Sequence, residues 1–360
     1  MPRIAGVAAA FPPRSYSQTE ITELLGPIIT ANPSKLALLK RLHANSKVER
    51  RHLVMPYDWY KNSDLNFTLT NNTFIVAAVD LAEEATVSAL AKADLKPTDV
   101  DFIVFTSVTG ISAPSVDALM ALRLGFRSDV KRMPMFGLGC VAGAAGIARV
   151  NDYLIGHPGE VGLLISVELC SLTVQRGDDS MGNLVASGLF GDGSAAVIMV
   201  GTERAKSMPV TGPDVLDTRS RLYPGTREVL GFNPSESGFR IVLTAGVADV
   251  IDEHFDTDVV GLLDEHELAV DDIDVWMAHP GGPRVLNSFS SALGLPEGAL
   301  DVSWESMAEK GNMSSASVLH VLAETLDRNT FGAGDRGLLF ALGPGVCAEI
   351  VLMRWPEATS

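Results

Sequence analysis

The two halves of this 360-residue chain repeat one series of motifs at a nearly constant distance. An acidic turn, an apolar run and a polar turn occupy 95–110 and recur at 268–282. A glycine followed by a polar residue opens a helical stretch at Cys140 and again at Asn312. Equivalent positions lie 172 to 175 residues apart. Such regular internal repetition predicts a duplicated structural unit.

The repeated pattern also predicts a fold class. Near-continuous apolar strands that alternate with helices predict an α/β protein, with mostly parallel sheets covered by helices on both faces. We divide the chain into an N-terminal half, 1–205, and a C-terminal half, 206–360. The segment 202–236 is rich in Pro, Gly, Asp and Arg, and we expect it to be an irregular excursion between the halves.

The composition excludes several classes of protein. The formal net charge of −16 argues against nucleic-acid binding, which needs a basic surface. No apolar run approaches the ~18 residues of a membrane span, and the first residues lack a secretory pattern. Three widely spaced cysteines form neither a disulfide framework nor a metal site. We therefore expect a cytoplasmic protein with no metal, no nucleic-acid partner and no membrane span.

Cys140 is the strongest candidate for a nucleophile. Gly137 and Gly139 allow a sharp turn before it, and the small, then periodically apolar residues after it predict a buried helix. The free N–H groups at a helix start favour the thiolate, which is the nucleophilic form of cysteine. A pseudo-twofold axis between the halves would bring Cys140 towards Asn312, with His279 at a strand end beside them. The alternatives are a buried cysteine of structural role and an Asn312 that only caps its helix.

Five motifs together make the chain resemble a known family. They are 139–143 (Gly-Cys-Val-Ala-Gly), 188–196 (Gly-Leu-Phe-Gly-Asp-Gly-Ser-Ala-Ala), 279–283 (His-Pro-Gly-Gly-Pro), 311–317 (Gly-Asn-Met-Ser-Ser-Ala-Ser) and 343–345 (Gly-Pro-Gly). With these motifs in this order, the chain resembles the thiolase superfamily and, within it, the type III polyketide synthases, which are the chalcone synthase-like family. The resemblance extends from about Ile4 to Trp355. It implies a thiolase fold, in which duplicated βα halves form a layered αβαβα architecture, and it implies a homodimer.

The resemblance also implies a reaction. An acyl-CoA starter is loaded on Cys140 and extended by decarboxylative Claisen condensation with malonyl-CoA, with no cofactor beyond these CoA thioesters. His279 would pair with the thiolate, and both His279 and Asn312 would donate hydrogen bonds to the enolate oxygen. An amide suits this position because a carboxylate would repel the enolate. Cations should line the path of the CoA phosphates, the alternative for them being an ordinary solvated charge run. The candidates are Lys47, Arg50, Arg51 and Arg284.

Further positions are assigned to the substrate cavity by the same resemblance. Phe190 would be a gate whose ring disfavours the malonyl carboxylate, and Phe239 would be a second gating aromatic residue. Ala113 stands where the plant enzymes have methionine and would open space for a medium or long fatty acyl starter. Val108 lacks a hydroxyl found in those enzymes, which favours lactone closure, so we expect an alkylpyrone or resorcinol-type product. The other cavity positions are Glu168, Cys170, Thr173, Ser314, Gly343, Pro344 and Gly345.

Three rival functions share parts of this pattern. A ketoacyl synthase III-like condensing enzyme also uses Cys, His and Asn, but it normally lacks the Gly-Gly-Pro after the His and takes its malonyl group from an acyl carrier protein. A hydroxymethylglutaryl-CoA synthase would need a catalytic Glu before its Cys motif, and none is evident. A non-catalytic acyl-binding protein of the thiolase fold would be expected to have lost one of the three polar residues, and all three are present.

Overall fold

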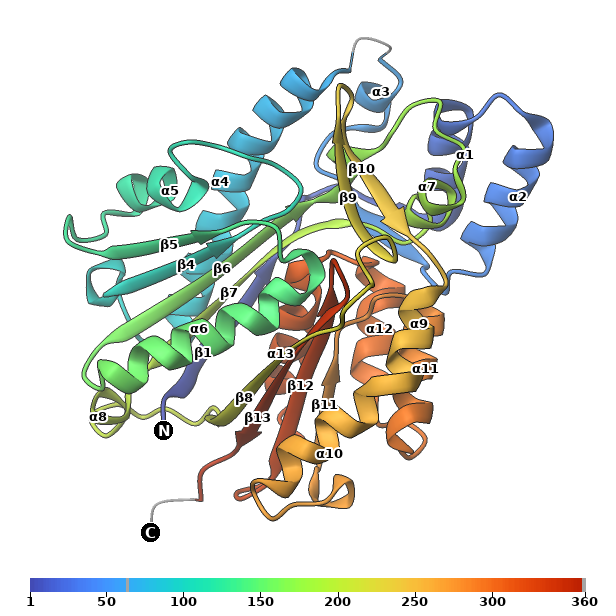
Figure 1. The fold of residues 1–360 in the computed structure, drawn as a ribbon. Coiled ribbons are helices and arrows are strands. Elements are labelled where there is room, and N and C mark those ends of the chain that lie inside the picture. Colours follow the sequence, from blue (N-terminus) through green and yellow to red (C-terminus); the bar gives the residue numbers. More distant parts are fainter. Residues whose placement is uncertain (63–64, 358–360) are drawn as a thin grey trace.

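The computed structural model describes residues 1–62 and 65–357, and in this part of the chain nine strands form one large sheet (Figure 1). The strand order is β11-β12-β13-β8-β1-β7-β6-β4-β5. The strands of the N-terminal half are β1 (Arg3–Ala10), β4 (Phe102–Thr106), β5 (Lys131–Met135), β6 (Val161–Leu169) and β7 (Asp192–Val200). Those of the C-terminal half are β8 (Asp214–Leu222), β11 (Val275–Ala278), β12 (Arg336–Gly343) and β13 (Cys347–Arg354).

The two halves of the sheet repeat each other, as the sequence predicts. Strands β4, β6, β7 and β1 have the same order as β11, β12, β13 and β8. The first pair in each series is parallel and the next two pairs are antiparallel. The expectation of mostly parallel sheets is therefore wrong: antiparallel pairs outnumber parallel ones within the described sheet. An apolar run shows that a strand is covered on both faces, which does not determine its direction.

The segment 202–236 is also more regular than we expected. It contains the short helix α8 (Thr202–Ala205), the strand β8 at the centre of the sheet, and β9 (Leu230–Ser235). Strand β8 pairs with β13 from Asp214 to Leu222, but its side chains become progressively exposed along its length. Because the second part of β8 is polar and exposed, its sequence lacks the apolar signal of a central strand.

Two helices lie between the halves and form the central layer. They are α6 (Ala142–Gly156) and α13 (Ser315–Arg328), which contact each other and strands of both halves. A Cβ added at Gly143 would lie 2.3 Å from the carbonyl oxygen of Ser315, so the two helix starts approach each other closely because residue 143 is a glycine. Equivalent helix starts thus meet at the centre of the molecule, which confirms the predicted pseudo-symmetry.

Outer helices complete the αβαβα layering on both sides (Figure 1). Helix α4 (Phe67–Lys92) covers β1, β6 and β7 of the N-terminal half. On the C-terminal half, α10 (Asp256–Asp264) continues α9 (Gly246–Val250) through a π-helical turn at 251–255, and α11 (Pro283–Leu293) packs against that turn. Helix α5 (Val116–Leu124) packs against α4, and α12 (Asp301–Lys310) packs against α13.

Smaller elements lie above the upper end of the sheet in Figure 1. Strands β9 and β10 (Gly238–Leu243) form a hairpin that is separate from the large sheet, and β10 contacts α7 (Met181–Ala186). A second two-stranded sheet is formed by β2 (Ser15–Ser17) and β3 (Arg50–His52). The helices of this region are α1 (Gln18–Ile29), α2 (Pro33–Ala44) and α3 (Tyr57–Tyr60). These elements enclose the cavity described below. Among the described residues, no helix is both long and apolar enough to cross a membrane.

Candidate active site

Cys140 lies in a tight turn between β5 and α6. A short 3-10 turn, 139–141, precedes the helix, and Gly137 and Gly139 have φ values of 95° and 55°. A Cβ added at Gly139 would lie 2.6 Å from the ring of Pro344, so only glycine fits between the turn and that loop. Cys140 is half-buried at the start of α6, as the sequence predicts.

A series of hydrogen bonds joins Cys140 to the other two candidate catalytic residues. The Cys140 thiol points to Ser314 Oγ at 3.5 Å. The backbone N–H of Ser314 donates to Asn312 Oδ1 at 2.8 Å, and Asn312 Nδ2 donates to the carbonyl oxygen of Gly281 at 3.2 Å. Gly281 belongs to the loop of His279, whose carbonyl oxygen accepts from the Gly281 N–H at 2.9 Å. The three motifs that are far apart in sequence therefore meet at one place.

His279 follows β11 and is only 3% exposed. Among the described residues, neither ring nitrogen has a hydrogen-bond partner. Burial lowers the pKa of His279 to about 3, so the imidazole is neutral at physiological pH. Burial therefore disfavours the protonated imidazole, and His279 accepts a proton only if a negative charge formed next to it offsets the lost hydration.

The electrostatics of Cys140 differ from the prediction of a resting thiolate. Burial raises the pKa of the Cys140 thiol to about 12; the hydrogen bond to Ser314 lowers that pKa, and the negative charge of Glu168 raises it further. Burial therefore favours the neutral thiol at Cys140, which must lose its proton during the reaction.

Ser314 holds an unusual backbone conformation beside the nucleophile. Its φ is 46° and its ψ is −123°, a combination that is costly for a residue with a Cβ. The hydrogen bond from its N–H to Asn312 helps to retain this conformation. The result is that the Ser314 hydroxyl lies against the Cys140 sulfur.

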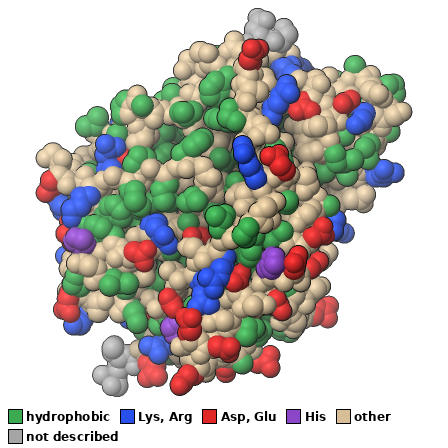
Figure 2. Space-filling model, in the orientation of Figure 1, with side chains coloured by type: hydrophobic (Ala, Val, Ile, Leu, Met, Phe, Trp, Pro, Cys, Tyr) green, Lys and Arg blue, Asp and Glu red, His purple; other side chains and the backbone are tan. Residues whose placement is uncertain are grey.

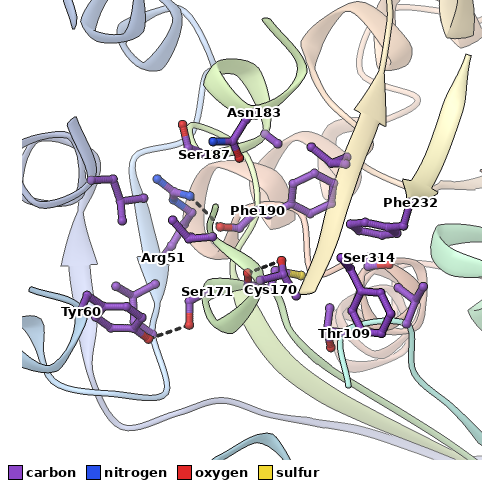
Figure 3. A pocket seen from close by; sticks show the side chains of 18 residues that line it. Arg51, Tyr60, Thr109, Cys170, Ser171, Asn183, Ser187, Phe190, Phe232 and Ser314 are labelled. Atoms are coloured by element: carbon purple, nitrogen blue, oxygen red, sulfur yellow. Dashed lines mark hydrogen bonds between the residues drawn. The ribbon is translucent and has the colours of Figure 1, made fainter. Parts of the chain in front are cut away.

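A cavity extends from Ser314 into the elements above the sheet (Figure 3). Seven of the residues predicted from sequence line it: Arg51, Val108, Cys170, Thr173, Phe190, Phe239 and Ser314. Sequence reasoning missed the rest: Leu25, Leu53, Tyr60, Thr109, Ser171, Val174, Asn183, Ala186, Ser187, Phe232 and Ile241. Figure 3 shows Tyr60 and Arg51 on the opposite side of the cavity from Ser314 and Phe232. Phe232 and Ile241 pair across the hairpin of β9 and β10. The sequence signal that could have identified them is the alternation of apolar residues on either side of a Gly-containing turn.

Aromatic rings separate this cavity from a second hollow nearer the surface. Phe232 and Phe239 line both, and Pro344 and Gly345 line the second hollow. The ring of Phe239 lies 6.3 Å from that of Phe232, and it also contacts Phe67 and Phe136. The predicted Gly343-Pro344-Gly345 loop therefore borders the site, and Gly343 packs against the nucleophile turn, where an added Cβ would lie 2.6 Å from the Leu138 oxygen.

Glu168 is near the site but does not line the cavity. It is fully buried, and it accepts hydrogen bonds from the Val108 N–H at 3.1 Å, from the Thr109 hydroxyl at 2.8 Å, and from Ser107 and Ser315. Burial raises the pKa of Glu168, and these hydrogen bonds oppose that shift. Because Ser315 begins α13, Glu168 ties the N-terminal half to the C-terminal helix that carries Ser314.

The remaining predicted residues lie outside the cavity of the single chain. Ala113 is exposed, in the loop before α5. Lys47, Arg50 and Arg284 are exposed, and Arg284 forms an ion pair with Asp249 at 3.1 Å.

Arg51 contradicts its prediction as a surface cation for CoA phosphates. It is 1% exposed, and both terminal nitrogens donate to protein oxygen atoms, so we remove it from the proposed phosphate-binding set. The described residues contain no group of three or more His, Cys, Asp or Glu side chains arranged to hold a metal ion.

Comparisons with known proteins identify related sequences and structures over nearly the whole chain. The family model of the N-terminal domain of chalcone and stilbene synthases matches 3–203, and that of their C-terminal domain matches 215–356. The chain is 48% identical over 352 residues to the 1,3,6,8-tetrahydroxynaphthalene synthase of Streptomyces peucetius subsp. caesius, covering 98% of this chain and 93% of that protein. It is 26% identical to the alpha-pyrone synthesis polyketide synthase-like Pks18 of Mycobacterium tuberculosis, covering 97% and 90%. The crystal structure of 1,3,6,8-tetrahydroxynaphthalene synthase from Streptomyces coelicolor superposes with a TM-score of 0.92 at 31% identity, covering 99% of this chain and 100% of that one.

Proposed function

The chain belongs to the chalcone and stilbene synthase family and is a type III polyketide synthase, and we propose that Cys140, His279 and Asn312 are its catalytic residues. Enzymes of this family are acyltransferases that catalyse decarboxylative Claisen condensation, with CoA thioesters as substrates. The observation that supports the assignment is the series of contacts from Cys140 through Ser314 and Asn312 to the His279 loop. The division of the chain at 205/206 also remains a proposal, which the ranges matched by the two family models support.

In the loading step, Cys140 Sγ gives its proton to His279 and attacks the carbonyl carbon of the acyl-CoA. The carbon–sulfur bond to CoA then breaks, and the CoA sulfur takes the proton from His279. Burial raises the pKa of the thiol and lowers that of His279, so both shifts oppose a free proton transfer, and the proposed transfer is coupled to the attack on the thioester.

In the condensation step, the bond between the carboxylate and methylene carbons of malonyl-CoA breaks, and the electron pair remains as an enolate. Asn312 Nδ2 and His279 donate hydrogen bonds to the enolate oxygen. CO2 departs, the enolate carbon attacks the thioester on Cys140, and the sulfur leaves as a thiolate that takes up a proton from solvent. Phe190 lies next to this site through its backbone bridge with Asn312, which supports its role as a gate.

For the starter, we propose malonyl-CoA itself and an aromatic product of the naphthalene class. The relative named 1,3,6,8-tetrahydroxynaphthalene synthase, at 48% identity over nearly the whole chain, favours this product. The cavity supports a compact intermediate, because four aromatic side chains, Tyr60, Phe190, Phe232 and Phe239, lie in its wall and limit the space for an alkyl chain. Ala113, the main reason to expect a long starter, does not line the cavity of its own chain.

The second candidate is the product class expected from the sequence, an alkylpyrone or resorcinol made from a medium or long fatty acyl-CoA. Its supporting observation is the apolar part of the cavity wall, formed by Leu25, Leu53, Val174 and Ile241 together with Val108. The relative named for alpha-pyrone synthesis fits this alternative at lower identity.

One incubation separates the two candidates. The purified enzyme is given radiolabelled malonyl-CoA alone, and then with a series of acyl-CoA starters from two to sixteen carbons, and product masses are determined. We expect an aromatic product from malonyl-CoA alone that does not change when long starters are added. Products that appear only with a long starter, and carry its alkyl chain, would instead establish the second candidate.

We also propose that the protein is a homodimer and that exposed basic residues attract CoA to the active site. Exposed apolar residues, which include Ile111, Leu122 and Phe136, lie near the edge strand β5, and Figure 2 shows hydrophobic side chains gathered on this face. A partner subunit would cover them and would bring its Ala113 loop close to the second hollow, which Pro344 and Gly345 line. Because the net charge is −16, the exposed cations Lys47, Arg50 and Arg284 would supply local attraction for the CoA phosphates.

A further inference from the structure

Three consecutive carbonyl groups, at residues 188, 189 and 190, are held by donors from three different parts of the chain. Gln18 Nε2 donates to the Gly188 oxygen at 2.7 Å, the Asn312 N–H donates to the Leu189 oxygen at 2.8 Å, and Arg51 Nη1 donates to the Phe190 oxygen at 2.6 Å. The Gly191 N–H donates in return to the Asn312 oxygen at 2.9 Å. The segment 188–191 thus places Phe190 and the backbone of Asn312 in one hydrogen-bonded unit.

Arg51 and Gln18 act on this segment together. Arg51 Nη2 donates to Gln18 Oε1 at 2.8 Å, so each side chain orients the other while each holds one carbonyl group. Burial lowers the pKa of Arg51 to about 10, and the nearby Asp192 carboxylate opposes that shift. The guanidinium therefore stays charged at neutral pH. Asp192 accepts hydrogen bonds from the Val54 N–H at 2.8 Å and from Ser171, which keeps it in place.

The alkyl part of Arg51 also fills the space beside the catalytic loop. A Cβ added at Gly311 would lie 2.8 Å from Arg51 Cγ and Cδ, and one added at Gly191 would lie 3.5 Å from Arg51 Cβ and Cγ. Gly311 has a φ of 70° and directly precedes Asn312. The side chain of Arg51 therefore contacts the backbone on both sides of the bridge between Phe190 and Asn312.

We infer that Arg51 is a positioning residue for the condensation step. Its side chain holds Asn312 and Phe190 in the positions relative to Cys140 that reaction of the enolate requires. This inference rests on the proposed donor role of Asn312. Removing the guanidinium would leave the part-buried Phe190 oxygen and Gln18 Oε1 without their donor, and the segment would shift to satisfy them. A displacement of about 1 Å at a reacting group costs up to ~100-fold in rate. Cys140 lies on the separate turn before α6 and bonds to Ser314, so starter loading depends on this segment less directly than decarboxylation does.

The test separates loading from decarboxylation in three variants. Acylation of Cys140 is followed by intact-protein mass with a non-extendable acyl-CoA, and kcat and KM are measured for CO2 release from malonyl-CoA. Arg51→Met should lower kcat for CO2 release by about 10- to 100-fold and leave KM and the loading rate within about twofold. Arg51→Lys should lie between, because one ammonium group cannot span both acceptors as the planar guanidinium does. Arg14→Met is the matched control: this arginine also donates to a backbone carbonyl, that of Val54 at 3.3 Å, but at the surface, and its rates should equal those of the wild type.

Several results would overturn the inference. A raised KM for malonyl-CoA with unchanged kcat would mean that Arg51 contacts the substrate directly. An equal loss of loading and decarboxylation would mean a general structural role. If Arg51→Met does not fold, Arg51→Lys and Gln18→Met carry the test, and their double variant should lose less than the product of the two single effects because both act on one segment. A wild-type enzyme that releases no CO2 would instead refute the proposed function, so the two failures are distinguishable.

Discussion

Replacing Asn312 tests the proposed division of labour in the active site. Only one amide hydrogen of Asn312 is available to the enolate, because the other is used in the bond to the Gly281 oxygen at 3.2 Å. Asn312→Ala therefore removes one oxyanion donor, which costs about 10²-fold in the decarboxylation rate, the lower end of the range for such donors. Loading of Cys140 should be nearly unchanged. CO2 release from malonyl-CoA and the intact mass of the acylated protein measure the two steps separately.

The same substitution has a second effect that a control isolates. Asn312 Oδ1 accepts the Ser314 N–H at 2.8 Å, and Asn312→Ala leaves this buried donor unpaired at a cost of about 1–3 kcal/mol in the free energy of unfolding. Asn312→Asp keeps an acceptor for Ser314 but donates nothing to the enolate. It should therefore lose decarboxylation as severely as Asn312→Ala, although the Ser314 N–H keeps its acceptor. An Asp variant that decarboxylates within about threefold of the wild type would refute the donor role, as would an equal loss of loading.

Other predictions concern the nucleophile, the dimer and the cavity. Acyl-CoA should add an acyl mass to the wild type and none to Cys140→Ala; an undiminished adduct in that variant would disprove the assignment. Because the pKa of the Cys140 thiol is raised to about 12, alkylation by iodoacetamide in the absence of substrate should rise with pH through pH 9 without a plateau, whereas a plateau near neutral pH would indicate a stored thiolate. Light scattering at micromolar protein should give twice the 38.3 kDa chain mass, and an active monomer would rule out the dimer. If the enzyme takes long starters, as the second candidate requires, Ala113→Met should suppress their turnover more than that of short starters; equal effects would place the cavity boundary away from the partner's Ala113 loop.

The sequence by itself determined the duplicated architecture and the three catalytic candidates. The constant spacing of motifs required two equivalent units, and equivalent helix starts must meet at the axis between them. The structure brings Cys140, Asn312 and the His279 loop together for this reason. Glycines before Cys140 and Asn312 were informative because the backbone at Gly139 and Gly311 has a positive φ with a neighbour at less than 3 Å from any added Cβ. Such local requirements are visible in a sequence.

Strand direction and pairing were decided by the tertiary structure. The apolar runs of β6 and β7 are buried along their whole length, yet these strands are antiparallel. Strand β8 was missed because its polar second part is recognisable as a strand only through its pairing with β13. Burial on both faces is a property of the residues in a strand, whereas direction depends on where the chain returns to the sheet.

The charge state and role of individual side chains also depended on distant partners. Arg51 stands in a run of charges that is typical of a surface, but it is buried, and its acceptors are Gln18, 33 residues away, and Phe190, 139 residues away. Cys140 stands at a helix start that favours a thiolate, but the protein packed around it removes water and raises the thiol pKa. Motif and spacing identify the groups that do chemistry because local geometry constrains them. Burial, which sets their charge and their contacts, is the sum of all the segments that fold over them and is known only when the whole chain has packed.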